Sequence, residues 1–95
     1  MNFVDASALG REDAKTFGIR PEHITVSEAK ADLAGKVSHI EHLGADTNLF
    51  VDCDDAGLIA ARLPGEQNFD IDAVVNLQFA DGRIYRFDDN GRSIV

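Results

Sequence analysis

Short segments that alternate apolar and polar residues, separated by turn residues, most limit the folds open to this chain. The alternation is clearest in residues 47–54 and 73–79. Because successive side chains of a strand point to opposite faces, this period predicts half-buried strands. Several such strands with turns every eight to twelve residues predict a mainly β fold, a small antiparallel barrel or sandwich of five or six short strands. The inward positions that the alternation predicts are Leu49, Val51, Cys53, Val75, Leu77 and Phe79.

Further strands are expected at residues 16–20, 24–26, 36–43, 58–63 and 83–88. Val37 and Ile40 fall on opposite parities, which indicates a bulge in their strand. The Asp81-Gly82 pair predicts a hairpin that returns residues 83–88 onto residues 73–79. One or two short helical turns are expected, at residues 27–34 with Ser27 as the cap and at residues 11–15 after a Ser7 cap.

Length and charge narrow the class of protein. Ninety-five residues correspond to one domain. Seventeen acidic against nine basic residues give a formal net charge of −8, which disfavours nucleic acid and anionic membranes as partners. One cysteine excludes an internal disulfide and indicates a reducing compartment. The sequence has neither an apolar run of spanning length nor a secretory signal, so a cytoplasmic location without membrane insertion is predicted.

Motifs for phosphate and calcium are incomplete. Residues 9–16 approximate a phosphate-binding loop, but Leu9 and Ala14 replace the two glycines that let the backbone wrap a phosphate. A calcium loop beginning at Asp52 has Ala56 and Leu63 at two ligand positions. We therefore expect a solvated turn rather than a calcium site, and no nucleotide or metal cofactor in this chain.

Zinc binding and catalysis are also disfavoured. The four potential ligands His23, His39, His42 and Cys53 lack the spacing of a tetrahedral site. Cys53 lies on a predicted inward face, where a thiol acts as a small apolar group rather than a nucleophile. The chain is therefore not expected to be an enzyme.

Two aromatic residues near the end of the sequence admit two interpretations. Tyr85 and Phe87 alternate on a predicted strand, as base-stacking residues do in some OB folds. The surrounding acidic residues favour the other interpretation, a pair of core aromatic residues.

The segment from Gly18 to His23 reads GIRPEH and resembles a motif in the C-terminal regulatory domain of ABC-importer ATPases. These are the ATP-binding subunits of importers for maltose, glycerol-3-phosphate and related carbohydrates. The resemblance continues through Gly35-Lys36-Val37 and the segment 40–47, which reads IEHLGADT, and ends at Phe87-Asp88 and Gly91. Residues 1–4, MNFV, resemble the junction between the ATPase core and this domain, where Met1 is either an internal methionine or the start of a separately encoded piece.

The resemblance implies a TOBE-type, OB-like barrel in residues 18–95, preceded by a junction segment in residues 1–17 that is shorter than in the family. It implies a non-catalytic regulatory and dimerisation role in the ATP-binding subunit of a sugar or sugar-phosphate importer. The implied partners are the ATPase core of the same parent chain, the counterpart domain in the ATPase dimer and, indirectly, the membrane subunits. ATP and Mg²⁺ belong to that core, at the cytoplasmic face of the inner membrane. A small-ligand, oxyanion-binding module of the TOBE type is the alternative.

Five residues of these motifs are candidates for regulatory or interface contacts: Arg20, Glu22, His23, Glu41 and Asp46. Arg20, Glu22 and His23 are expected to form a local charge-assisted cluster at the turn set by Pro21. The cluster either locks the turn or faces the ATPase core or partner domain and relays nucleotide state. Asp46 stands where the family commonly has glutamate, so its carboxylate reaches less far.

Overall fold

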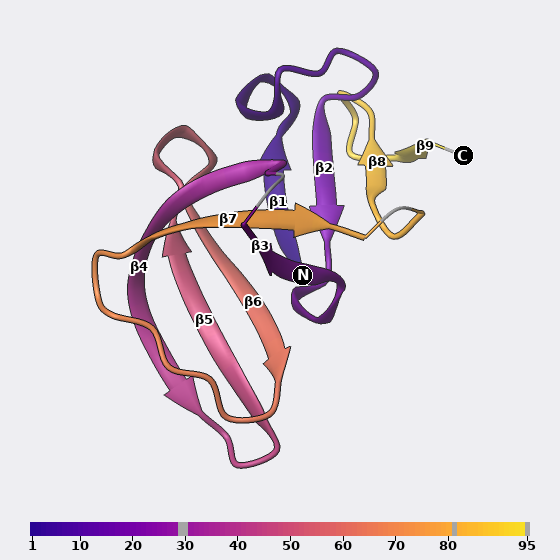
Figure 1. The fold of residues 1–95 in the computed structure, drawn as a ribbon. Coiled ribbons are helices and arrows are strands. Elements are labelled where there is room, and N and C mark those ends of the chain that lie inside the picture. Colours follow the sequence, from indigo (N-terminus) through magenta and orange to yellow (C-terminus); the bar gives the residue numbers. More distant parts are fainter. Residues whose placement is uncertain (29–30, 81, 95) are drawn as a thin grey trace.

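The computed structural model describes residues 1–28, 31–80 and 82–94, which fold into two antiparallel sheets (Figure 1). Three short 3-10 helices, η1 (Ala6–Leu9), η2 (Pro21–His23) and η3 (Asp54–Ala56), lie between strands. The strands of the described residues are β1 (Asn2–Asp5), β2 (Thr16–Ile19), β3 (Ile24–Ser27), β4 (Leu33–His42), β5 (Asp46–Asp52), β6 (Leu58–Pro64), β7 (Val74–Phe79), β8 (Tyr85–Phe87) and β9 (Ser93–Ile94). The expected mainly β, OB-like antiparallel fold is confirmed, although these nine strands exceed the five or six predicted.

The larger sheet has the strand order β3-β7-β4-β5-β6. Strands β4, β5 and β6 form a curved meander, and β7 crosses one end of it to pair with β4 (Figure 1). The inward positions predicted from the alternation are all buried. They pack with Val4, Ile19, Ile24 and Ile59 in one apolar core.

Strand β4 contains the predicted bulge. Val37 lies opposite Val51 and His39 lies opposite Phe50, so the ladder gains one residue at Ser38. Before the bulge, Gly35 lies so close to β5 that a Cβ there would collide with the carbonyl oxygen of Asp52. Glycine therefore permits the close approach of the two backbones at this bend.

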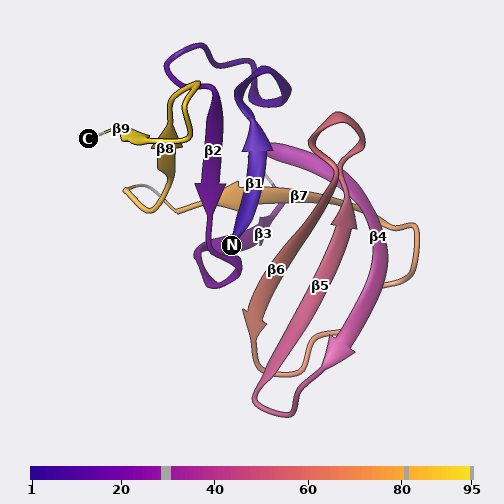
Figure 2. The ribbon, with the colours of Figure 1, turned by 180° about the vertical axis from the view of Figure 1, so that it is seen from behind.

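The smaller sheet has the order β1-β2-β8-β9 (Figure 2). The expected pairing of residues 83–88 with residues 73–79 is wrong, because β8 pairs with β2 instead. β7 already has β3 on one side and β4 on the other, so it offers no free edge. Asp81 of the predicted hairpin lies outside the described residues.

Neither expected helical segment forms as predicted. Residues 11–15 have no helix, and the turn instead occurs earlier, as η1. Within residues 27–34, Ala29 and Lys30 lie outside the described residues, while Ser27 and Leu33 belong to strands. Asp32 donates its N–H to Leu77 O, and its carboxylate accepts the N–H of Phe79 at 2.7 Å. Pairing with β7 thus outweighs the local helix propensity.

The side chain of Asn2 connects the two sheets. Its Nδ2 donates to the carbonyl oxygen of Ala60 at 2.7 Å, and its Oδ1 accepts the N–H of Ala60 at 2.9 Å. Nδ2 also lies 3.3 Å from the carbonyl oxygen of Ile19. One amide thus satisfies both backbone groups of Ala60 on β6, the edge strand of the larger sheet, as a neighbouring strand would.

Candidate functional site

The turn between β2 and β3 is held by backbone geometry. Arg20 is extended, with φ −76° and ψ 144°, as the residue before a proline prefers. Pro21 then occupies the first position of η2, and His23 N–H donates to Arg20 O at 2.9 Å. The proline and this bond account for the local conformation without any side-chain contact.

The charge-assisted cluster expected among Arg20, Glu22 and His23 is wrong. No hydrogen bond or ion pair joins their side chains in the structure described. Arg20 lies over the ring of Tyr85, with 5.9 Å between its guanidinium carbon and the ring centroid. The ring nitrogen Nδ1 of His23 is enclosed and has no hydrogen-bond partner among the described residues. Arg20 is extended before the 3-10 turn and lies toward β8, whereas Glu22 and His23 belong to the turn itself.

Glu22 instead shares a cavity with Asp46, which comes from the second motif. Both line a cavity of about 370 Å³ together with Arg62 and Pro64. Arg62 Nε donates to Asp46 Oδ2 at 2.9 Å. The two side chains are 46% and 32% exposed, so this ion pair adds little to stability and remains accessible to a partner. Two candidate residues, 24 positions apart, therefore share one site.

Arg62 was not predicted from the sequence as a site residue. In the ladder, Asp46 lies opposite Pro64 and Asn48 lies opposite Arg62, which puts Asp46 and Arg62 in diagonal contact. The contact between Asp46 and Arg62 could be predicted from the strands expected at residues 47–54 and 58–63 only if the register of their pairing were known. Glu41 lies opposite Asn48 on β4 and is exposed, in the same row of strands as Arg62.

Thr47 has a structural role in the second motif. Its side chain is fully buried, its hydroxyl donates to Gly65 O at 2.8 Å, and it accepts the N–H of Gln67 at 3.0 Å. It thereby fixes the chain after β6, beside the cavity of Glu22 and Asp46. The chain that follows Pro64 is consequently held at two backbone positions, whereas the charged side chains of the site are exposed.

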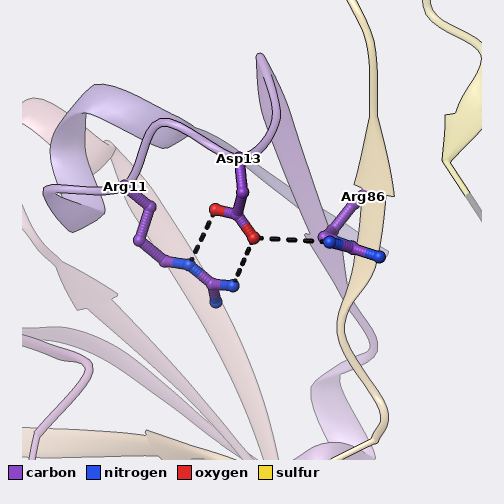
Figure 3. A network of polar contacts seen from close by, with 3 residues as sticks. All are labelled: Arg11, Asp13 and Arg86. Carbon is purple, nitrogen blue, oxygen red and sulfur yellow. Dashed lines mark hydrogen bonds and ion pairs between the residues drawn. The ribbon is translucent and has the colours of Figure 1, made fainter.

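The segment that approximates a phosphate loop is occupied by its own ion pairs (Figure 3). Arg11 donates to both carboxylate oxygens of Asp13, at 3.1 and 2.7 Å, and lies 4.4 Å above the centroid of the Phe17 ring. Asp13 also accepts from Arg86 at 3.5 Å. The hydrogen bond from Arg11 is the largest cause of the lowered pKa of Asp13. This network attaches the loop to β8 and engages Arg11 with a carboxylate of its own segment.

Cys53 is buried, as predicted, next to η3. Burial, followed by the charges of Asp52 and Asp54, raises the pKa of its thiol to about 11. A thiol with so high a pKa forms little thiolate near neutral pH, so it is a poor nucleophile. Tyr85 differs from its prediction, because it is 41% exposed and is not part of the core.

Neither a cluster of metal ligands nor a membrane-spanning helix is present in the described residues. Within residues 1–28, 31–80 and 82–94, no group of three or more His, Cys, Asp or Glu residues is arranged to hold a metal ion. Over the same residues, the structure contains no helix with the length and apolar character required to cross a membrane.

Comparison with known proteins gives matches that cover most of the chain. The TOBE domain family matches residues 17–87. The maltose/maltodextrin import ATP-binding protein MalK of Vibrio parahaemolyticus is 29% identical over 92 residues, which cover 95% of this chain and 25% of MalK. The spermidine/putrescine import ATP-binding protein PotA of Mesorhizobium japonicum is 35% identical over 57 residues, which cover 60% of this chain and 16% of PotA. The chain thus spans a quarter or less of the length of these two curated relatives.

Proposed function

Because the chain belongs to the TOBE domain family, we propose that it is the non-catalytic regulatory and dimerisation domain of the ATP-binding subunit of an ABC importer. The observation that carries this proposal is the similarity to MalK across 95% of the chain. The ATPase core, with its ATP and Mg²⁺, would lie in the larger part of such a subunit that this chain does not match. The assembled subunit would work at the cytoplasmic face of the inner membrane, in contact with the membrane subunits.

Within this proposal, the imported solute is a sugar or sugar phosphate. The MalK similarity extends over 92 residues, whereas the PotA similarity extends over 57. The longer match includes more of both sheets, so it favours the carbohydrate class over the polyamine class.

The site formed by Glu22, Asp46 and Arg62 is the proposed regulatory contact. Its carboxylates and guanidinium come from three different elements, η2, β5 and β6, and together they present both signs of charge to a partner. An exposed ion pair of this kind can exchange its partner at low energetic cost. Glu41 extends the same charged row toward the β4–β5 turn.

Replacement of the matching segment in Vibrio parahaemolyticus MalK by this chain tests the proposal. We expect the chimera to support maltose uptake in cells that lack their own MalK, and the matching PotA chimera to support less spermidine uptake. A folded MalK chimera that hydrolyses ATP but gives no uptake would contradict the proposed function. Equal or better function in PotA would contradict the carbohydrate assignment.

Two substitutions in the chimera test one residue of this site, Asp46, and one candidate outside it, Arg20. Arg20→Ala and Asp46→Ala should alter the regulation of uptake while leaving the unfolding midpoint of the isolated domain nearly unchanged. Asn68→Ala, on an exposed connection, is the matched control. Unfolding of the isolated Arg20→Ala domain would show that this residue only maintains the turn.

Oxyanion binding, the alternative, is tested by calorimetry with molybdate and sulfate on the isolated chain. Lys15 lines a cavity of about 460 Å³ beside Ser7 and Gly10, and this cation is not engaged in an ion pair in the described structure. Micromolar binding that Lys15→Ala abolishes would favour the alternative. An absence of heat with either anion would exclude it.

A further inference from the structure

The connection between β6 and β7, residues 65–73, runs across one side of the β4-β5-β6 meander without forming a strand (Figure 1). Near β6, the N–H of Gln67 donates to the hydroxyl of Thr47 at 3.0 Å. Near β7, the N–H of Asp72 donates to the carbonyl oxygen of Val37 at 2.8 Å. Both ends are thus attached to the larger sheet, so a partner that binds the middle of the connection has little chain to order.

A groove lies between the middle of this connection and the ends of β3 and β7. Its cavity has a volume of about 380 Å³, and its apolar lining comes from Val26, Phe69, Val74 and Val75. Val26 and Phe69 also pack against the core, so the groove borders the apolar interior. Ligand pockets span about 300 to 1,000 Å³, so this volume suits one or two inserted side chains rather than a large ligand.

Val74 departs from the pattern of its strand. Its side chain is 70% exposed, the highest exposure of any large apolar side chain that the structure describes. The side chains that share its face of β7, Asn76 and Gln78, are polar, as the solvated face of a sheet normally is. Ile71, in the same connection as Phe69, is 57% exposed. Exposed apolar side chains beside an apolar groove indicate a surface that another molecule covers.

The groove lies in the acidic part of the chain. Residues 21–80 contain eleven acidic and three basic residues, whereas residues 1–20 and 82–95 contain five acidic and six basic residues. The net charge of −8 therefore arises in the part of the chain that forms the larger sheet. A field of this sign raises the local concentration of cationic partners and repels acidic ones.

Three carboxylates lie at or next to the groove. Glu28 lines it, and Asp70 and Asp72 belong to the connection beside it. All three residues are exposed, and none makes an ion pair in the part of the chain that the structure describes. Lys36, on the neighbouring strand β4, lies opposite Asp52, so a carboxylate of β5 is already beside it. The rim of the groove therefore offers negative charge to a partner.

We propose that this groove binds a basic peptide segment of a partner protein. The segment inserts an apolar side chain against Phe69 and Val74, and its flanking Lys or Arg side chains lie near Glu28 and Asp70. Apolar contact supplies affinity, whereas charge selects basic segments over acidic ones. Among the described residues, the groove shares none with the cavity of the proposed regulatory contact, so this inference goes beyond the proposed function and does not rest on it.

Amide spectra of the isolated chain, titrated with a synthetic pentapeptide, test the proposed binding. The probe has blocked ends, a central leucine and two lysines on each side. We expect saturable shifts centred on residues 26–28, 69 and 74–76, with a dissociation constant on the order of 0.1 to 1 mM for so small an interface. Binding should weaken at least about threefold when the salt concentration is raised from roughly 0.05 to 0.5 M. A pentapeptide with a central serine should bind at least about fivefold more weakly, and one with glutamates in place of the lysines should not bind.

Two variants at exposed positions test the residues of the groove. Val74→Ser and Glu28→Gln should each weaken binding at least about threefold, because the first removes an apolar contact and the second removes a charge. Leu58→Ser, at a 60% exposed position on β6, and Asp55→Asn, in η3, are the matched controls and should bind like the parent chain.

These outcomes separate a specific groove from general attraction to an acidic protein. Equal binding of the leucine and serine peptides, shifts centred on η3, or equal losses in the variants and their controls would overturn the inference, as would an absence of saturable shifts. The uptake of the MalK chimera is measured without the pentapeptide, so the proposed function can hold while this inference fails, and the reverse.

Discussion

Asn2 provides the most direct energetic test of the fold, because one side chain joins the two sheets. Replacing it with alanine removes the partners of the N–H and the carbonyl of Ala60, on a strand that is half-buried at this point. Each lost hydrogen bond costs about 1 kcal/mol net, and the longer contact to Ile19 O contributes less. We therefore expect the free energy of unfolding of Asn2→Ala to fall by about 2 to 3 kcal/mol.

Urea unfolding followed by circular dichroism measures this loss. With a denaturant slope of roughly 1 kcal/mol per molar urea for a domain of this size, the midpoint should fall by about 2 to 3 M. Asn2→Asp should be at least as damaging, because it places a carboxylate oxygen against the carbonyl of Ala60. Asn68→Ala is the surface control and should stay within about 0.5 kcal/mol of the parent chain. A loss below about 0.5 kcal/mol in Asn2→Ala would show that the two sheets are held together by apolar packing alone.

Three further predictions concern buried and charged groups. Thr47→Val should lower the free energy of unfolding by about 2 kcal/mol, because the methyl group retains the packing but loses both hydrogen bonds to residues 65 and 67; in urea titrations, an effect no larger than that of the exposed Thr25→Val would contradict this. The pKa of the Asp13 carboxyl should be below 3.8 in carbon-detected NMR and should rise in Arg11→Ala, because the hydrogen bond from Arg11 is the main cause that lowers it. The lowered pKa adds stability that is present above the ordinary pKa and is lost as the pH falls through the lowered one. An unchanged titration midpoint in Arg11→Ala would refute the role of Arg11. Cys53, whose pKa burial raises to about 11, should react with Ellman's reagent at pH 8 only in urea, and rapid labelling of the folded chain would contradict its burial. Its contribution to stability is present below the ordinary pKa of 9.0 and should disappear as the pH rises toward 11.

Local pattern was sufficient to predict most strands of this fold. The alternation around Leu49 and Leu77 identified their inward faces, since burial of one side of a strand requires that period. The parity change between Val37 and Ile40 identified the bulge, because a strand with one buried face must gain a residue to change parity. The inward faces and the bulge depend only on residues that are close in the sequence, so a single sequence is sufficient to predict them.

Strand pairing could not be predicted in the same way. The Asp81-Gly82 signal favoured a hairpin, but β7 has neighbours on both sides, and only the full topology reveals this. The helix expected around Ser27 was likewise displaced by a contact with β7, in which Asp32 supplies the hydrogen bonds. Non-local pairing outweighs local propensity wherever it satisfies backbone groups that would otherwise be buried without partners.

Only part of the candidate site could be predicted, because its contacts are also non-local. The motifs supplied Glu22 and Asp46, but Arg62, which bonds Asp46 and lines the same cavity, comes from a strand that no motif includes. The expected cluster at the Pro21 turn does not form because Arg20 is extended before the turn and lies over Tyr85, a contact that the local sequence does not reveal. Contacts between side chains on neighbouring strands depend on the register of the pairing, and the hydrophobic pattern alone does not fix that register to a single residue.

The order of strands in the smaller sheet has a consequence for synthesis of the chain. β1 and β2 come from its first nineteen residues, yet β8 and β9, which complete their sheet, come from residues 85–94. During translation, β2 is therefore made long before β8, its second neighbour in the sheet. Until β8 is available, the edge of β2 that it later covers, at residues 16–18, remains open to other strands. The interval between these two events is when a nascent chain of this topology is most exposed to wrong pairing.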